Sequence, residues 1–279
     1  MMSQATANST ASKRIAITGA GSGLGRAIAL RYAKAGWKVA VTDLETTRAR
    51  TVAGEVERAG GIALVETLDT RREADFEQLM QRLRAEWGGV DVFVNNAGVA
   101  SAGTAAETTP EDWEWLLDIN LMGVVRGTRA ALPLLRESRG RLINIASFAA
   151  IANAPGMASY NVAKAGVLSL SETVRGEEHR FGVGVTVACP AFFATNLMDN
   201  FRGAEPGQKD MVQKLMSRSS VTADTVADDI FEAAAAGRFL VISHRESRWQ
   251  YRLKRLHPDM FFQAVRKATR SFIERKDKT

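Results

Sequence analysis

The stretch TGAGSGLG, residues 18–25, decides the fold through what stands on either side of it. Residues 14–18 (RIAIT) have the composition of a buried strand, and a helical pattern then continues to about Ala35 and ends at Gly36. Glycines let a turn approach a pyrophosphate closely, and the free N–H groups at a helix N-terminus attract its charge. The spacing TGxxxGxG is met, although Leu24 takes the last glycine position of GxGxxG. The stretch predicts a nucleotide-binding turn, with a plain glycine-rich turn as the alternative.

Six further β-branched runs follow along the chain, separated by longer helical patterns. They cover residues 38–43, 62–65, 90–95, 141–146, 183–188 and 239–243. This alternation predicts an α/β fold in which helices cover both faces of a parallel sheet. A long helix is expected between the fourth and fifth runs, with Thr109 as its N-cap, Pro110 in its first turn and Asp112 closing a capping box.

Two motifs end predicted strands and suit a nucleotide. Asp43 closes the second strand, where a carboxylate can accept hydrogen bonds from ribose hydroxyls and repel a 2′-phosphate. No arginine or lysine stands at positions 42–45, which favours NAD over NADP. Residues 95–98 (NNAG) end the fourth strand, and their small side chains suit close approach of a ligand. The alternatives are a solvated aspartate and a glycine turn with local asparagine hydrogen bonds.

Tyr160 and Lys164 stand four residues apart and therefore share one face of a helix. A phenol with a pKa of about 10 is a poor acid or base at neutral pH. A neighbouring ammonium and an oxidised nicotinamide would both favour the phenolate and lower that pKa. Ser147, at the end of the fifth strand, could hold a substrate oxygen beside Tyr160. An isolated pair of this spacing is more often a surface pair, so its meaning depends on the other motifs.

Together these motifs resemble a known family. TGAGSGLG, NNAG, Asn120 in DINLMG, Ser147, YNVAK and CPAFFAT occur in the order and spacing of the classical short-chain dehydrogenase/reductase family, over residues 12–243. The resemblance implies a single doubly wound Rossmann-type domain with seven parallel strands. It also implies hydride transfer between a nicotinamide and an alcohol or carbonyl carbon, and a homodimer or homotetramer.

The resemblance also assigns roles to residues. Tyr160 would be the general acid/base, with Lys164 lowering its pKa and holding the nicotinamide ribose; Ser147 would position the substrate oxygen. Asn120 would hold a water that links Lys164 to solvent. The cofactor-binding residues would be Gly19, Ser22, Gly23, Leu24, Gly25, Asp43, Asp69, Thr70, Asn96, Ala97, Gly98, Tyr160, Lys164, Pro190, Phe193 and Thr195. No metal is expected. The chain departs from the family at Ala191, where glycine is usual, which leaves the path of that turn open.

The expected substrate pocket is apolar. Its predicted lining is Phe148, Met157, Phe192 and Met198, with Ala149, Ile151, Phe193 and Phe201 nearby. These residues favour a hydrophobic alcohol or ketone, although several can be core residues instead. Residues 196–220 are expected to form a lid, and its Arg202 and Lys209 could bind an acidic head group. The alternatives for the function are an NADP-dependent carbonyl reductase and a catalytically idle cofactor sensor.

The two ends of the chain differ from the body. Residues 1–11 are expected to be a disordered tail, and residues 244–279 a basic, amphipathic helical extension with 11 lysines and arginines against 4 acidic residues. This extension could pack on the body or on another subunit, or lie on an anionic membrane. The rest of the chain is nearly neutral, which disfavours nucleic acid as a partner. A single cysteine, Cys189, favours a reducing compartment, so we expect a cytoplasmic protein.

Overall fold

The fold is centred on one parallel sheet. The computed structural model describes residues 12–194, 196–203, 208–217 and 219–273. The sheet has seven strands in the order β3-β2-β1-β4-β6-β7-β9. They are β1 (Arg14–Ile17), β2 (Lys38–Asp43), β3 (Ile62–Thr67), β4 (Val92–Asn95), β6 (Arg141–Ile145), β7 (Gly184–Ala188) and β9 (Leu240–Val241). All seven predicted runs form strands, and the order reverses between β1 and β4, where open α/β sheets bind ligands.

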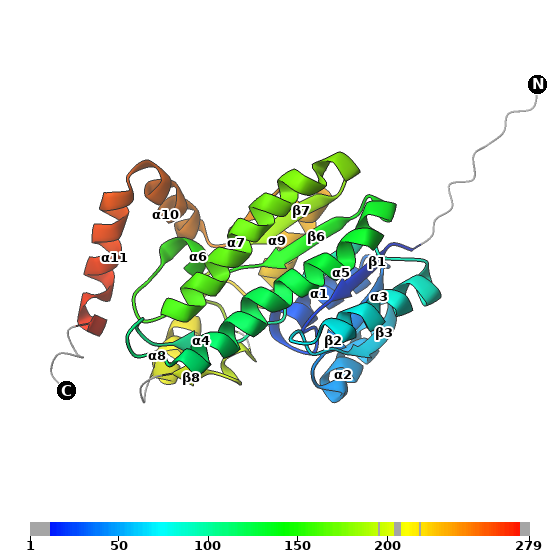
Figure 1. Ribbon diagram of the computed structural model, residues 1–279, viewed down its shortest axis with the longest axis horizontal. Coiled ribbons are helices and arrows are strands. Elements are labelled where there is room, and N and C mark those ends of the chain that lie inside the picture. The colour runs from blue at the N-terminus through cyan, green and yellow to red at the C-terminus, as the bar shows by residue number, and fades with distance from the viewer. Residues whose placement is uncertain (1–11, 195, 204–207, 218, 274–279) are drawn as a thin grey trace, which may run out of the picture.

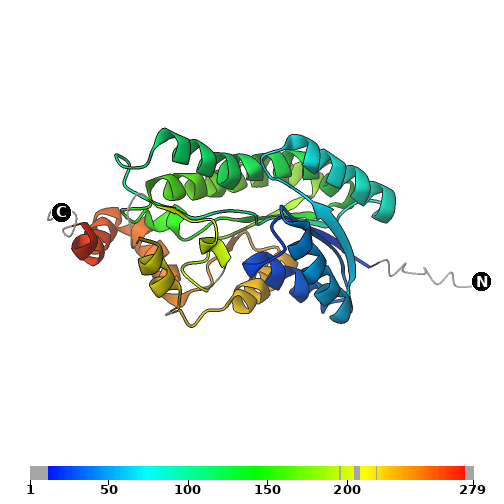
Figure 2. The same ribbon diagram turned by 90° about the horizontal axis from the view of Figure 1, so that it is seen from below.

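Helices cover both faces of this sheet (Figures 1 and 2). One face carries α1 (Gly23–Ala33), α2 (Thr46–Arg58) and α9 (Ala223–Ala235). The other carries α3 (Glu73–Trp87), α4 (Pro110–Leu117), α5 (Gly123–Ser138) and α7 (Ala158–Glu178), which is followed by a 3-10 turn, His179–Phe181.

Successive side chains of a strand point to opposite faces of the sheet and therefore pack alternately against the two layers of helices. Ile15 and Ile17 belong to the core beneath α1, α2 and α9, whereas Ala16 belongs to the core beneath α3 and α5. Strands buried on both faces explain why the sequence showed continuous apolar runs rather than an alternating pattern. The predicted fold class is therefore confirmed.

The long helix expected after Thr109 is present but is not regular. The Asp112 backbone N–H donates to Thr109 Oγ1 at 3.2 Å, whereas the Asp112 carboxylate accepts from Arg202 Nη1 at 3.0 Å. The helical run then contains a π-helical stretch, Asp118–Met122, between α4 and α5. Such stretches often occur at functional sites, and this one contains Asn120.

Smaller elements surround the carboxyl ends of the strands. The two-residue strand β5 (Ser101–Ala102) pairs with β8 (Arg202–Gly203), and α6 (Ala149–Ala152) follows β6. The segment after β7 contains a 3-10 turn, Asn196–Met198, and α8 (Gln208–Ser217). After β9, α10 (Arg245–Leu256) and α11 (Pro258–Ile273) form a helical hairpin at the end of the molecule opposite β1 (Figure 1).

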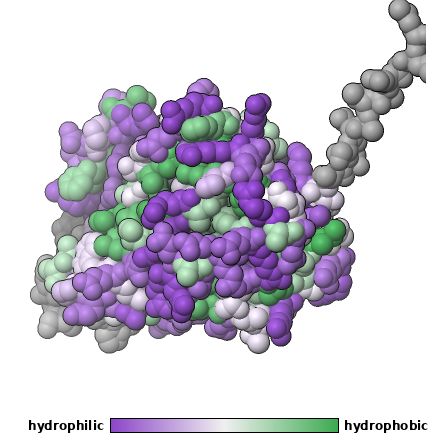
Figure 3. Space-filling view, turned by 45° about the vertical axis from the view of Figure 1, so that its right-hand side comes forward, coloured by the Kyte–Doolittle hydropathy of each residue, from purple (hydrophilic) through white to green (hydrophobic). Residues whose placement is uncertain are grey.

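The surface shows no single large apolar area on the face drawn in Figure 3, where hydrophobic side chains are interspersed among hydrophilic ones. Among the described residues, no helix is both long and apolar enough to cross a membrane. The expected N-terminal tail, residues 1–11, lies outside the described part of the chain, as do residues 274–279.

Candidate active site

A cavity of about 640 Å³ lies at the carboxyl ends of the strands. Most of the residues predicted for the site line it. They are Gly19, Ser22, Gly23, Leu24, Asp43, Asp69, Thr70, Asn96, Ala97, Gly98, Ser147, Phe148, Met157, Tyr160, Lys164, Pro190, Phe192, Phe193 and Met198. Gly25 and Asn120 do not line it, and Thr195 lies outside the described residues.

The glycine turn is built so that the start of α1 faces this cavity. Gly19 and Gly23 have φ of +62° and +52°, which side-chain-bearing residues rarely adopt. A Cβ on Gly25 would lie 2.3 Å from the Gly19 carbonyl oxygen, so this glycine allows close packing of α1 against the turn rather than contact with a ligand. The first turn of α1 carries no acidic residue, and the Ser22 side chain makes no capping hydrogen bond. Its N–H groups therefore suit a pyrophosphate.

The two sides of the turn are tied together by Thr18 and Asn96. The backbone N–H groups of Asn96 and Ala97 donate to Thr18 Oγ1 at 2.9 and 3.0 Å. Asn96 Nδ2 donates to the carbonyls of Thr18 and Gly19 at 2.9 and 3.0 Å. The side-chain amide of Asn96 thus holds the turn in place, and Asn96 also lines the cavity in which the resemblance implies a cofactor.

The end of the cavity next to β2 contains both a carboxylate and arginines. Asp43 accepts from the N–H groups of Gly21 and Glu45, each at 3.0 Å. Arg48 and Arg71 also line this end. Each arginine is paired, Arg48 with Glu45 at 3.1 Å and Arg71 with Asp69 at 2.6 Å. The Arg71 hydrogen bonds hold the pKa of Asp69 below its ordinary value. Positions 42–45 contain no basic residue, but Arg48 lies in the first turn of α2, and this turn places it beside Asp43 at the end of β2.

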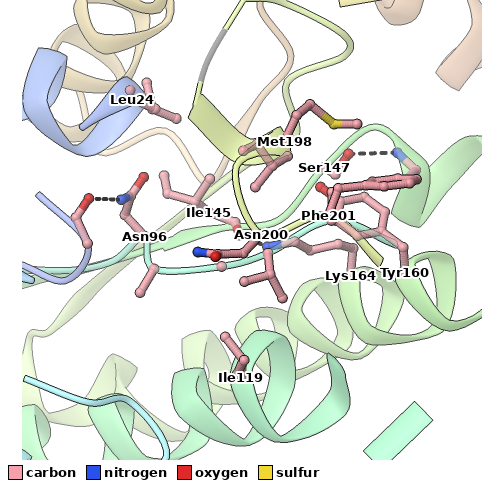
Figure 4. Close-up of a pocket in the computed structure, with 18 of the residues that line it drawn as sticks. Leu24, Asn96, Ile119, Ile145, Ser147, Tyr160, Lys164, Met198, Asn200 and Phe201 are labelled. Atoms are coloured by element: carbon pink, nitrogen blue, oxygen red, sulfur yellow. Dashed lines mark hydrogen bonds between the residues drawn. The ribbon is translucent and has the colours of Figure 1, made fainter. Parts of the chain in front are cut away.

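Ser147, Tyr160 and Lys164 converge on one part of the cavity (Figure 4). Ser147 follows β6, and the Ala149 N–H donates to its Oγ at 3.1 Å. Tyr160 and Lys164 project from the first turns of α7, and both are buried. Lys164 Nζ donates to the Ile145 carbonyl at 3.0 Å. Small neighbours explain the close approach of α7, since a Cβ on Gly166 would lie 2.9 Å from Leu121.

Burial governs the protonation of this group. It raises the pKa of Tyr160 above its ordinary value, while a hydrogen bond to Ser147 acts in the opposite direction. Burial also lowers the pKa of Lys164 to about 8, so the ammonium still predominates at neutral pH. The sequence suggested that Lys164 would lower the Tyr160 pKa. In the protein alone burial of the phenol outweighs that effect, because Lys164 Nζ lies 5.9 Å from the Tyr160 ring centre and bonds to a carbonyl.

Asn120 lies behind the cavity wall. Its side chain accepts from the Val99 N–H and donates to the Val99 carbonyl, both at 2.8 Å. A Cβ on Gly98 would lie 3.1 Å from Asn120 Oδ1 and 3.6 Å from Lys164 Nζ. Gly98 therefore leaves a small space next to both groups, and the π-helical stretch turns Asn120 towards it.

The turn after β7 contains Ala191 without backbone strain. In the described part of the chain, Arg139 and Asn153 are the non-glycine residues with positive φ, so Ala191 avoids the conformation that would require glycine. The Ala191 N–H donates to His244 Nδ1 at 3.3 Å, and His244 Nε2 donates to the Phe192 carbonyl at 3.1 Å. The sequence gave no sign of this role for His244, which lies 53 residues further along the chain.

The substrate end of the cavity is mainly apolar. Phe148 and Met157 come from the β6 side, while Phe192, Met198 and Phe201 come from the segment after β7. Trp115 of α4 also lines it and was not predicted. Ile151, by contrast, is a core residue, and Lys209 is not among the lining residues. Arg202 reaches the cavity, but its guanidinium is paired with Asp112 and lies 4.1 Å from the Trp115 ring centre.

The described residues contain no group of three or more His, Cys, Asp or Glu side chains that could hold a metal ion. The cavity combines the glycine turn at the start of α1 with a buried tyrosine and lysine beside a serine. A doubly wound sheet with a cavity at its switch point is the class of fold in which nucleotides bind at the carboxyl ends of the strands.

Comparisons with known proteins agree with this class. The family model for short chain dehydrogenases matches residues 13–206. The probable oxidoreductase EphD of Mycobacterium tuberculosis is 34% identical over 229 residues, which cover 78% of this chain and 39% of EphD. The chain thus spans about two fifths of the length of that relative. A 3-oxoacyl-(acyl-carrier-protein) reductase of Synechocystis is 37% identical over 192 residues, covering 68% of this chain and 77% of the reductase.

Among solved structures, a short-chain dehydrogenase/reductase from Burkholderia phymatum in complex with NAD aligns with a TM-score of 0.83 and 30% identity, covering 90% of this chain and 95% of that one. The chain therefore belongs to the short-chain dehydrogenase/reductase family.

Proposed function

We propose that this protein transfers hydride between NAD(H) and the alcohol or carbonyl carbon of a hydrophobic substrate. The observation that carries the proposal is the convergence of Ser147, Tyr160 and Lys164 in the same cavity as the glycine turn. We also propose residues 12–243 as the catalytic domain and residues 196–220 as its substrate lid.

The chemistry follows from the positions of these side chains. When bound, the nicotinamide supplies the hydride acceptor or donor. In the oxidative direction Ser147 holds the substrate hydroxyl, and the Tyr160 phenolate accepts its proton. The Lys164 ammonium would hold the nicotinamide ribose and, with the positive charge of an oxidised ring, would favour the phenolate of Tyr160 over the phenol. The second lone pair of Asn120 Oδ1 remains for a water that links Lys164 to solvent.

Replacing Tyr160 tests the proposal directly. In Tyr160→Phe we expect kcat to fall by about 10²–10⁴-fold, because the proton acceptor is gone, while the Kd for the cofactor stays within about twofold. The measurement is turnover of a panel of secondary alcohols and ketones, together with cofactor binding by fluorescence. Tyr251→Phe, which alters a tyrosine of α10, is the matched control. Unchanged turnover in Tyr160→Phe would favour the alternative of a cofactor-sensing protein.

The same panel tests the substrate class. The apolar lining of the cavity supports lipophilic alcohols and ketones over polyols. Arg202 is the reason to include acids in the panel, although it is already paired with Asp112. Turnover of small polyols without turnover of lipophilic alcohols would contradict the proposed substrate class.

NAD is the proposed cofactor because Asp43 ends β2 beside the glycine turn. The alternative, NADP, is supported by Arg48 and Arg71 at the same end of the cavity. We expect Asp43→Ala to reduce kcat/KM for NAD by about 10-fold or more, because it removes a charged hydrogen-bond acceptor. The ratio of kcat/KM for NAD to kcat/KM for NADP should therefore fall. Arg48→Ala should have little effect with NAD. A wild-type kcat/KM that is higher for NADP would show that the arginines decide the cofactor.

For its partners we propose a small alcohol or ketone and further copies of this chain in a homodimer or homotetramer, and no nucleic acid. The proposed location is the cytoplasm. Residues 244–279 are the part that would contact a membrane surface.

A further inference from the structure

The helical hairpin α10–α11 stands apart from the catalytic body. Both views place it at the end of the molecule where the strands terminate, with α11 outermost (Figures 1 and 2). It is attached through α10: Lys254 Nζ donates to the Ile151 carbonyl of α6 at 2.5 Å, Ser247 is buried, and Tyr251 packs against the core beside α6. Within the hairpin, Phe261 of α11 is buried and its ring centre lies 5.9 Å from Lys254 Nζ. The hairpin therefore leaves most of its own surface exposed.

That surface contains large apolar side chains. Trp249, Leu256, Met260 and Phe262 are 63%, 73%, 59% and 64% exposed, the highest values among the large hydrophobic residues in the described part of the chain. Trp249 and Leu256 stand seven residues apart, so they lie on the same side of α10, two turns from each other. Met260 and Phe262 stand two residues apart in α11, so they face different sides of that helix, and the shared apolar side of the hairpin is the one that Trp249 and Leu256 form on α10.

Basic side chains surround these apolar residues. Arg248, Arg252 and Arg255 of α10 and Arg266 and Lys267 of α11 are exposed. Among the described residues, the ion pairs involve no arginine or lysine of the hairpin. Their charge is thus available to an external partner, while the remainder of the chain is nearly neutral.

We infer that α10 and α11 bind the surface of an anionic lipid bilayer. Arginines attract anionic headgroups, and Trp249 and Leu256 enter the interface between headgroups and acyl chains, where tryptophan is favoured. A second copy of the hairpin fits less well, because a two-fold contact between identical surfaces would bring arginine against arginine. The body of a second copy offers no compensating net negative charge.

The attachment of the hairpin to α6 places the proposed membrane contact close to the cavity. Lys254 joins α10 to α6, and Ala149 and Ala152 of α6 line the apolar end of the cavity. A bilayer bound by the hairpin would therefore lie close to the place where a lipophilic substrate enters. This last step rests on the proposed function, whereas membrane binding itself does not.

Vesicle sedimentation with the full-length protein tests the inference. We expect binding to vesicles of phosphatidylglycerol and phosphatidylcholine in equal parts to exceed binding to phosphatidylcholine alone by at least about 10-fold, and to weaken as salt is added. The double variant Arg248→Glu, Arg252→Glu should lose at least about 10-fold in binding, and so should Trp249→Ala, Leu256→Ala. Ile62→Ala, which shortens an exposed apolar residue on edge strand β3, is the matched control and should bind like the wild type.

Several results would overturn the inference. Equal binding to both kinds of vesicle would do so, as would wild-type binding by the double variants. Sedimentation velocity tests the alternative that the hairpin contacts another subunit. If the Trp249→Ala, Leu256→Ala variant changes the oligomeric state but not vesicle binding, the hairpin is a subunit interface. Retained cofactor binding shows that each variant is folded. Tyr160→Phe should bind vesicles normally, so failure of the proposed chemistry and failure of membrane binding are distinguishable.

Discussion

The Lys164 ammonium occupies a place that costs the folded protein stability. Burial lowers its pKa to about 8 from an ordinary value of 10.5. Below pH 8 the lysine is charged in both states, but the charge is more stable in the unfolded state, where water surrounds it. The difference corresponds to about 3 kcal/mol, partly offset by the hydrogen bond to the Ile145 carbonyl.

Replacing this lysine should therefore separate stability from activity. We expect Lys164→Met to raise the Tm at pH 7 by a few degrees and to lower kcat by at least about 10²-fold. Between about pH 8 and 10.5 the folded wild type loses this proton before the unfolded state does, so its stability should rise over this range. The difference in Tm between Lys164→Met and the wild type should therefore be smaller at pH 9.5 than at pH 7. Calorimetry at both pH values checks this. An equal or lower Tm for the variant at pH 7 would contradict it.

His244 should make cofactor binding sensitive to acid. Burial lowers its pKa, with the Phe192 hydrogen bond, Glu246 and Asp229 opposing. Protonation would place an N–H where Nδ1 now accepts from the Ala191 N–H, which breaks the contact that holds the turn. We expect the KM for the cofactor to rise as the pH falls below about 6.5, and His244→Gln to remove this dependence. His179→Gln, at an exposed histidine, should keep the wild-type profile.

At the scale of elements, the contact between β8 and α4 sets the shape of the substrate end. Arg202 of β8 pairs with Asp112 and lies over the Trp115 ring. An exposed ion pair and a cation–π contact together contribute about 1–1.5 kcal/mol. This contact holds the segment after β7 against the body.

Loss of this contact should affect the substrate more than the cofactor. We expect Arg202→Ala to raise the KM for the substrate by about 5–10-fold with the Kd for the cofactor within about twofold, as measured by steady-state kinetics and fluorescence titration. Arg84→Ala, which breaks the exposed pair with Glu137 far from the cavity, is the control. A rise in the KM of similar size in both variants would contradict the role of Arg202.

The elements also show where sequence reasoning succeeds. The strand, turn and helix around TGAGSGLG were predicted because local spacing determines how these elements follow one another, although Gly25 packs α1 against the turn instead of lining the cavity. Arg48, Trp115 and His244 come from other elements, and only tertiary packing brings them to the cavity. The π-helical stretch around Asn120 was missed for a similar reason, since apolar periodicity does not register one extra residue in a helical turn.

At the scale of the whole molecule, the central strands could be predicted because, like β2 and β4, they are buried on both faces and therefore almost continuously apolar, whereas the edge strand β3 is partly exposed. Their order could not be derived from composition and was supplied by the family resemblance. The two-residue strands β5 and β8 carry no compositional signal at that length. The amphipathic pattern of residues 244–279 predicted helices, but it could not say that the hairpin would stand away from the body.

The packing of α1 against α9 has a consequence for how the protein is made. Arg31 of α1 pairs with Asp228 of α9, 197 residues later, and both helices contribute to the same core. At a synthesis rate of about 5–20 residues per second, roughly 10–40 s pass before the second helix leaves the ribosome. During that interval the core residues of α1, Ile28 among them, lack the α9 side chains of the same core. We therefore expect chaperones to bind the N-terminal half of the nascent chain.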